Sequence, residues 1–130
     1  YPESLGVQVA LPDRVVVCIT GDGAMMMTLQ EIATAAAYDI PMLCVVGHNE
    51  VFGNMRLSQI RNYGGRFIST DVPTPNLANV ARELGAHAER VEDPDEIIPA
   101  VGRALASGKA SLLEIMIDVS EENLMPPSSR

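Results

Sequence analysis

The stretch Val15-Val16-Val17-Cys18-Ile19-Thr20-Gly21-Asp22-Gly23 decides how this chain of 130 residues folds. Its first part is a continuous apolar run rich in β-branched residues. Such a run predicts a strand at about 15–20 that is covered on both faces of a parallel sheet. Its second part, Gly-Asp-Gly, ends the strand and leaves a carboxylate at the strand's carboxyl end. Taken alone, this tripeptide is more often an ordinary turn than a metal-binding loop.

A second apolar run leads to a second polar group at the same kind of position. Met42-Leu43-Cys44-Val45-Val46 predicts a strand over about 42–47, and His48-Asn49 follows it. Between the two strands, Thr28-Leu29-Gln30-Glu31 has the pattern of a capping box and predicts the start of a helix that ends before Pro41. Ligands of parallel sheets bind beyond the carboxyl ends of the strands. Asp22 and Asn49 are therefore expected to share one site.

The remainder of the chain continues the alternation of helices and strands. The patterns predict helices at about 53–63, 74–85 and 93–108, and strands at 86–91 and 111–118. In the last helix, Ile97, Ile98, Val101 and Leu105 are expected to face inward. This order predicts an α/β fold, a parallel sheet with helices on both faces, in a single domain over residues 1–130.

Composition excludes several classes of function. The formal net charge of −8 argues against sequence-independent binding of nucleic acid, which relies on Lys and Arg. No apolar stretch approaches the roughly 20 residues that span a bilayer, so no membrane segment is expected. Cys18 and Cys44 lie in predicted core strands and are expected to be reduced, which fits a cytoplasmic protein. The chain begins at Tyr1 without a Met, which leads us to expect a part of a longer polypeptide.

The residues at the two strand ends suit a divalent cation and a phosphorylated ligand. Asp22 offers a charged oxygen and Asn49 a neutral one, and a main-chain carbonyl of the turn after Asn49 would add a third. Mg²⁺ prefers such an oxygen-only set and keeps positions for phosphate oxygens and water. The glycines on either side of Asp22 let main-chain amides approach a phosphate closely. These residues predict a site for Mg²⁺ and a phosphorylated cofactor.

With these motifs, the sequence resembles the thiamine diphosphate enzymes of the acetolactate synthase, pyruvate oxidase and pyruvate decarboxylase family. The family signature is Gly-Asp-Gly, a spacer and Asn-Asn, which correspond here to Gly21-Asp22-Gly23 and His48-Asn49. Flanking segments also match, namely Ala10–Arg14, Leu29–Ala35 and Val91–Pro94. The similarity covers essentially the whole chain and corresponds to the C-terminal, diphosphate-binding domain. His48 replaces the first Asn, and the stretch 121–127 is similar to the pyruvate oxidase branch.

The resemblance implies a set of site residues and two cofactors, thiamine diphosphate and Mg²⁺. The implied metal ligands are Asp22, Asn49 and the Val51 carbonyl. The implied cofactor-binding residues are Gly21, Asp22, Gly23, Ala24, Asn49, Val51, Phe52 and Gly53. No catalytic residue of this chain is implied, because the family's activating glutamate belongs to a separate pyrimidine-binding domain. That domain, of the same or another chain, is the implied partner, together with a small 2-oxo acid substrate and further copies in a homo-oligomer.

The implied function is Mg²⁺-dependent binding of the cofactor's diphosphate within an enzyme acting on 2-oxo acids, by acetolactate synthase-like carboligation or by decarboxylation. The cofactor serves such reactions as an electron sink, and this segment alone is not expected to turn over substrate. Two alternatives remain from the residues themselves. One is an α/β module that binds a different phosphorylated ligand, and the other is an inactive interaction domain. For His48, both an acid–base role and a role in packing or hydrogen bonding remain open.

Overall fold

A computed structural model describes residues 1–118 of the chain. The bounds of the helices and strands, in chain order, are α1 Pro2–Ala10, β1 Val17–Gly21, α2 Asp22–Met26, α3 Glu31–Ala37, β2 Leu43–His48, α4 Gly53–Tyr63, α5 Leu77–Glu83, β3 His87–Val91, η1 Pro94–Glu96 (a 3₁₀ helix), α6 Ile97–Ala106 and β4 Ser111–Met116. The stretch 121–127, whose similarity to the pyruvate oxidase branch was noted above, lies outside the described residues.

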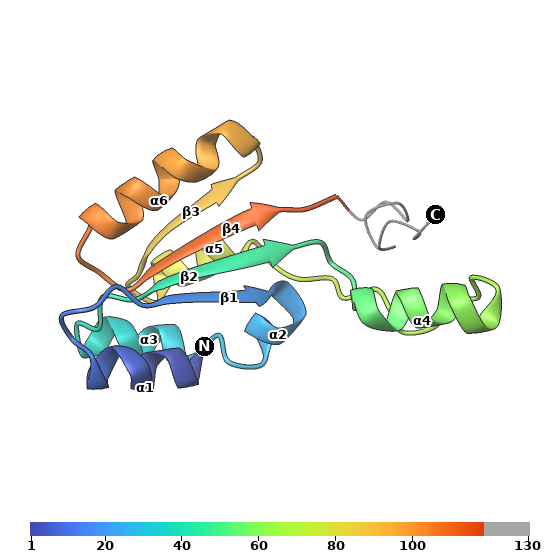
Figure 1. Cartoon of the computed structure of the whole chain (residues 1–130), viewed down its shortest axis with the longest axis horizontal. Coiled ribbons are helices and arrows are strands. Elements are labelled where there is room, and N and C mark those ends of the chain that lie inside the picture. Colours follow the sequence, from blue (N-terminus) through green and yellow to red (C-terminus); the bar gives the residue numbers. More distant parts are fainter. Residues whose placement is uncertain (119–130) are drawn as a thin grey trace.

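The strands form one parallel sheet in the order β1-β2-β4-β3. Cys18 pairs with Cys44, and Cys44 pairs with Leu112, so the two predicted strand ends lie at the same edge of the sheet. In Figure 1 all the arrowheads point toward the side of the molecule that carries α2 and α4. The predicted α/β fold with a parallel sheet is confirmed.

Helices cover both faces of the sheet, as predicted. On one face, Met25, Ile32, Ala35 and Leu77 from α2, α3 and α5 pack with α1 against inward-facing residues of all four strands. On the other face, α6 packs through small residues onto β2, β3 and β4. Figure 1 shows α6 on one side of the sheet and α1 and α3 on the other.

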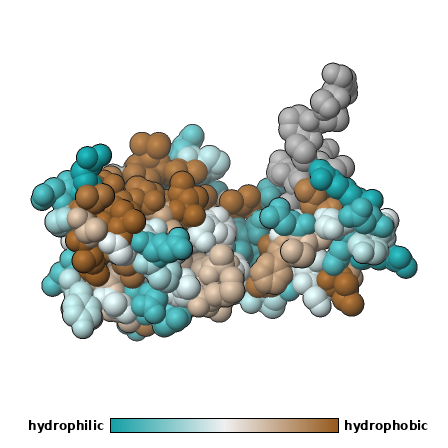
Figure 2. All heavy atoms as spheres, turned by 60° about the horizontal axis from the view of Figure 1, so that its bottom comes forward, coloured by the Kyte–Doolittle hydropathy of each residue, from teal (hydrophilic) through white to brown (hydrophobic). Residues whose placement is uncertain are grey.

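β1 is not covered on both faces, which corrects the prediction made from its apolar run. Cys18 is buried on the inner face, but Val17 is exposed and Ile19 is 81% exposed on the outer face. The reason is that α6 covers the β3–β4 side of the sheet and does not extend over β1. Figure 2 shows most of the apolar side chains over the body of the molecule and fewer of them at the end that carries α4.

Of two further local predictions, one was wrong and the other was right only in part. Thr28 and Glu31 do not form a capping box: the Glu31 amide donates to the Thr28 carbonyl (3.0 Å), and the Glu31 carboxylate accepts instead from the Thr34 hydroxyl (3.0 Å). In α6, Ile97 and Val101 pack against the core as predicted, but Ile98 is 77% exposed and Leu105 is also exposed. Ala100 and Ala104 complete the buried stripe.

α4 extends away from the sheet and carries none of its residues in a buried position (Figure 1). Gly64 ends it in the left-handed conformation, at φ 61°, which glycine adopts without a steric penalty. The helix is instead supported by the segment after it, because Gln59 bonds to Ile68 and Arg56 pairs with Asp71. Within residues 1–118, none of the helices has the length and apolar character needed to span a bilayer.

Candidate functional site

Asp22 is the centre of the candidate site. It follows the last residue of β1 and begins α2, and it is only 2% exposed. Its Oδ1 accepts a hydrogen bond from the Gly23 amide (2.8 Å), and its Oδ2 accepts from the amides of Asn49 (3.1 Å) and Glu50 (2.6 Å). A carboxylate has about four acceptor positions. Three amides therefore leave one position for a further ligand.

The loop after β2 is held from two sides. The amides of its first two residues are bound by Asp22, and Phe52 N–H and the Glu50 carbonyl bond to the main chain at 70–72 (2.8 and 2.7 Å). The Asn49 carboxamide oxygen accepts from the Val51 amide (3.2 Å), which leaves it a second lone pair. Glu50 lies at φ 57°, an uncommon conformation for a residue other than glycine. The hydrogen bond from its amide to Asp22 stabilises this conformation.

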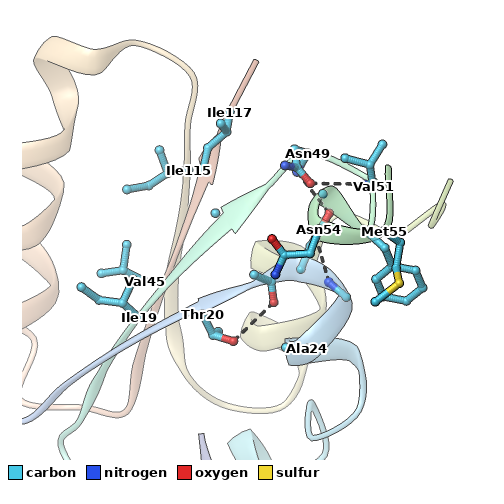
Figure 3. A pocket seen from close by; sticks show the side chains of 16 residues that line it. Ile19, Thr20, Ala24, Val45, Asn49, Val51, Asn54, Met55, Ile115 and Ile117 are labelled. Atoms are coloured by element: carbon cyan, nitrogen blue, oxygen red, sulfur yellow. Dashed lines mark hydrogen bonds between the residues drawn. The ribbon is translucent and has the colours of Figure 1, made fainter. Parts of the chain in front are cut away.

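All eight cofactor-binding residues predicted from the sequence line one cavity of about 600 Å³. This volume lies within the range usual for sites of small molecules. In Figure 3, Asn49, Val51, Asn54 and Met55 lie along one side of the cavity, at the end of β2 and the start of α4. On the other side, Ile19, Val45, Ile115 and Ile117 form an apolar wall. The cavity thus joins a polar loop to the open face of the sheet.

The glycines on either side of Asp22 have different surroundings. A Cβ at Gly23 would lie 2.8 Å from Cε1 of Phe52, so the ring would have to move. A Cβ at Gly21 would meet no protein atom within 4 Å, and the φ of −93° suits any residue. Neither packing nor backbone conformation requires glycine at 21. The space next to it is open to a ligand.

His48 and Glu114 form a buried pair beside this loop. His48 Nδ1 lies 2.5 Å from Glu114 Oε1, and His48 Nε2 lies 2.9 Å from the Thr74 hydroxyl. Glu114 is fully buried on β4 and also accepts from the amides of Leu77 (3.1 Å) and Ala78 (3.0 Å) at the start of α5. The ring of His48 is thus hydrogen-bonded on both sides, which corresponds to the hydrogen-bonding role left open from the sequence.

The electrostatic surroundings of Asp22 favour a bound cation. In the described part of the chain, its only basic neighbour within salt-bridge distance is His48, with Nε2 3.9 Å from Oδ2. A buried carboxylate is costly unless a cation or hydrogen bonds compensate it. No group of three His, Cys, Asp or Glu side chains within residues 1–118 is arranged to hold a metal ion. A cation here would need the neutral oxygens of Asn49 and the main chain, an oxygen set that suits Mg²⁺ and not Zn²⁺.

Some residues of the site were missed from the sequence. The sequence pattern places Glu114 only in an apolar strand, although a charged residue inside Leu112-Leu113-Glu114-Ile115-Met116 is itself a signal of a buried partner. Thr74 was placed at a helix start, whereas the structure has Asn76 as the cap of α5, accepting from the Asn79 amide (2.7 Å). Arg56, on α4, pairs with Asp71 (3.0 Å).

Comparison with known proteins places this geometry in a family. The profile described as "Thiamine pyrophosphate enzyme, C-terminal TPP binding domain" matches residues 1–115. The chain is 36% identical over 132 residues to a probable acetolactate synthase large subunit of Methanococcus aeolicus, covering 100% of this chain and 22% of that protein. It is 33% identical over 119 residues to a sulfoacetaldehyde acetyltransferase of Alcaligenes xylosoxydans xylosoxydans, covering 88% and 20%.

A solved structure has the same fold. The thiamine diphosphate-dependent 4-hydroxybenzoylformate decarboxylase of Rhodococcus jostii RHA1 superposes with a TM-score of 0.86 and 28% identity, over 92% of this chain and 23% of the other. Both kinds of comparison agree that the chain spans about a fifth of the length of its relatives.

Proposed function

The chain belongs to the thiamine pyrophosphate (thiamine diphosphate) enzymes, as their C-terminal cofactor-binding domain, and from this premise we propose that it holds the diphosphate of the cofactor through Mg²⁺. In this proposal Asp22, the Asn49 carboxamide and the Val51 carbonyl coordinate the cation. The residues around them, Gly21, Gly23, Ala24, Phe52 and Gly53, lie against the cofactor.

One observation carries the proposal. The Asp22 carboxylate is buried, has no Lys or Arg partner in the described part of the chain, and retains one acceptor position toward a cavity. A divalent cation would satisfy that position and offset the cost of the buried charge. The open space next to Gly21 then accommodates the diphosphate oxygens that the same cation binds.

The residues of this chain bind and orient, and the cofactor supplies the reactive centre. When bound, thiamine diphosphate provides an electron sink for cleavage or formation of a bond next to a carbonyl group. The amides of Asn49 and Glu50 fix the direction of the Asp22 carboxylate. The apolar wall of Ile19, Val45 and Ile115 borders the far side of the cavity, where a less polar part of the cofactor can lie. We extend the proposal to a whole enzyme that acts on a small 2-oxo acid, by carboligation or decarboxylation.

Completion of the site requires a partner in this proposal. Ile19 is 81% exposed at the cavity wall, and α4 beside the cavity buries none of its residues. We propose that a pyrimidine-binding domain, of the same or another chain, covers this open side, and that the enzyme is a homo-oligomer. The two cysteines are buried and unpaired, which supports a reducing compartment such as the cytoplasm.

Calorimetric titration of the full-length protein tests the proposal. Thiamine diphosphate is titrated with Mg²⁺ present and with Mg²⁺ removed by chelation, for the wild type and for Asp22→Ala. We expect binding by the wild type only with the cation, and at least a 100-fold loss in Asp22→Ala, about 2.7 kcal/mol. Equal binding with and without Mg²⁺ would reject the metal site. Binding of other phosphorylated ligands but not of thiamine diphosphate would favour the alternative of a different phospholigand module.

A further inference from the structure

A buried side-chain pair joins the end of β2 to β4 directly beside the Asp22 loop. We propose that His48 and Glu114 are positioning residues, which hold the main chain at 49–50 so that its amides keep Asp22 directed at the cation. This inference rests on the proposed function, because it assigns a role to residues outside the proposed ligand set. It also gives a reason for a histidine at 48, where the resemblance leads to an asparagine.

Glu114 is the fixed end of the arrangement. Its Oε1 accepts from the Leu77 amide and its Oε2 from the Ala78 amide, so both oxygens are directed by the start of α5. Arg90 approaches Oε1 at 3.6 Å, and the side chain is fully buried. A carboxylate held by two amides and a nearby guanidinium has little freedom to move. It is therefore a rigid acceptor for the next group.

His48 connects this fixed carboxylate to the loop that begins at Asn49. Because both Glu114 oxygens act as acceptors, Nδ1–H of His48 is the donor in the 2.5 Å contact. In the neutral ring Nε2 is then an acceptor, and the Thr74 hydroxyl at 2.9 Å can donate to it. The main chain of His48 is held as well, since its carbonyl accepts from the Ile117 amide (2.9 Å). The end of β2 is thus fixed through both its side chain and its backbone.

The next two residues are the ones that hold Asp22. The amides of Asn49 and Glu50 donate to Oδ2, and Glu50 has the uncommon positive φ. If the end of β2 moved, both amides would move together and the carboxylate would lose its direction. In other metal sites, losing an outer partner of a ligand weakens metal binding by about 10–100-fold. The same mechanism applies here through the backbone at 49–50.

Two polar substitutions separate this role from simple packing. In His48→Asn, the side-chain amide stands near the place of Nδ1 and can still donate to Glu114. In His48→Gln, the amide stands near the place of Nε2, so it reaches Thr74 and not Glu114. The two variants share the same chemical group and differ by one methylene. The proposal therefore predicts that His48→Asn keeps the affinity for the cation and that His48→Gln lowers it.

Mn²⁺ replaces Mg²⁺ in the experiment, because its electron paramagnetic resonance signal reports binding without turnover. Free and bound Mn²⁺ are measured with the full-length protein and thiamine diphosphate. We expect affinity close to the wild type for His48→Asn and a loss of about 10–100-fold for His48→Gln. Leu112→Ala, a buried core substitution two residues before Glu114 on β4, is the control for lowered stability. It is expected to lower the melting temperature and leave Mn²⁺ affinity unchanged.

The outcomes separate this inference from the function on which it rests. If the wild type binds no Mn²⁺ and equals Asp22→Ala, the proposed function fails and the inference fails with it. If the wild type binds Mn²⁺ and His48→Gln binds it equally well, only the positioning role is rejected. The same rejection follows if Leu112→Ala loses as much affinity as His48→Gln, because the loss would then reflect stability alone.

Discussion

Replacing Gly21 by alanine separates a glycine kept for a ligand from a glycine kept for the fold. The added Cβ meets no protein atom within 4 Å, and the residue has an ordinary φ of −93°. Gly21 caps α2, where alanine is less favourable by about 0.5–1 kcal/mol. The loss of freedom in the unfolded chain offsets this by about 0.4–1 kcal/mol. We therefore expect the free energy of unfolding to change by less than about 0.5 kcal/mol.

Cofactor binding, in contrast to stability, should change strongly in Gly21→Ala. The new methyl group would occupy the space where the diphosphate is proposed to lie, so we expect binding to weaken by at least about tenfold, or 1.4 kcal/mol. Urea denaturation of the cofactor-free protein gives the stability, and calorimetric titration with Mg²⁺ and thiamine diphosphate gives the affinity.

Gly102 offers a matched control for the same substitution. It lies within α6, away from the cavity, and a Cβ there also meets nothing within 4 Å. In a helix interior, alanine is more stable than glycine by about 0.5–1 kcal/mol. Gly102→Ala should therefore gain stability and bind the cofactor as the wild type does. The reasoning is refuted if Gly21→Ala loses more than about 2 kcal/mol of stability, or if it binds the cofactor normally.

Three further predictions follow from individual groups. Asp22→Asn places an amide donor against main-chain N–H donors. We expect the free energy of unfolding of the cofactor-free protein, measured by urea denaturation, to fall by about 1–3 kcal/mol. An unchanged free energy of unfolding would contradict the hydrogen bonding described. The hydrogen bonds from Arg103 lower the pKa of Glu89, so this pair stabilises the fold above the usual carboxyl pKa and the effect disappears as pH falls through the lowered one. Arg103→Ala should melt below the wild type at neutral pH, with the difference vanishing in acid; a constant difference at all pH values would refute it. Burial raises the pKa of the Cys44 thiol, and Cys18 is buried beside it. Neither cysteine should therefore react with a thiol reagent at pH 8 until the protein unfolds. Rapid labelling of the native protein would contradict this.

The parallel direction of the strands could be predicted from sequence because β1 and β2 are short apolar runs with a helical segment between them. Val15–Ile19 and Met42–Val46 have few competing interpretations, and the helical segments between them require parallel crossovers. Once the sheet is parallel, Asp22 and Asn49 must lie at the same edge. Their presence in one cavity thus follows from the fold, while their binding of Mg²⁺ and a cofactor stays a prediction.

The capping box failed because its groups already had partners. The Thr28 amide donates to the Met25 carbonyl (3.0 Å), so it is not free for the carboxylate of Glu31. The Glu31 amide in turn is used by the carbonyl of Thr28. A pattern of four residues cannot reveal that turns starting at α2 satisfy these amides first. The same dependence on surroundings decided the orientation of α6.

In α6, hydrophobicity alone identified only half of the inward-facing residues correctly. Ile97 and Val101 pack against the sheet as predicted. Ile98 and Leu105 are exposed, although they are larger and more apolar than the buried Ala100 and Ala104. Small residues let the helix approach the sheet closely, where Leu43 of β2 and Leu113 of β4 fill the interface. The helix could have been placed in either phase from its sequence, because both stripes have helical spacing.

Side chains alternate between the two faces of the sheet along each strand, so the two faces contribute differently to the site. On β2 and β4, His48 and Glu114 point to the face covered by α5, and their neighbours Val45 and Ile115 point to the opposite face. One face therefore supplies a buried polar support for the Asp22 loop, and the other supplies an apolar wall for the cavity. A shift of one residue in the pairing of β4 would exchange these tasks. The register Val46–Glu114 is thus a condition of the site as well as of the fold.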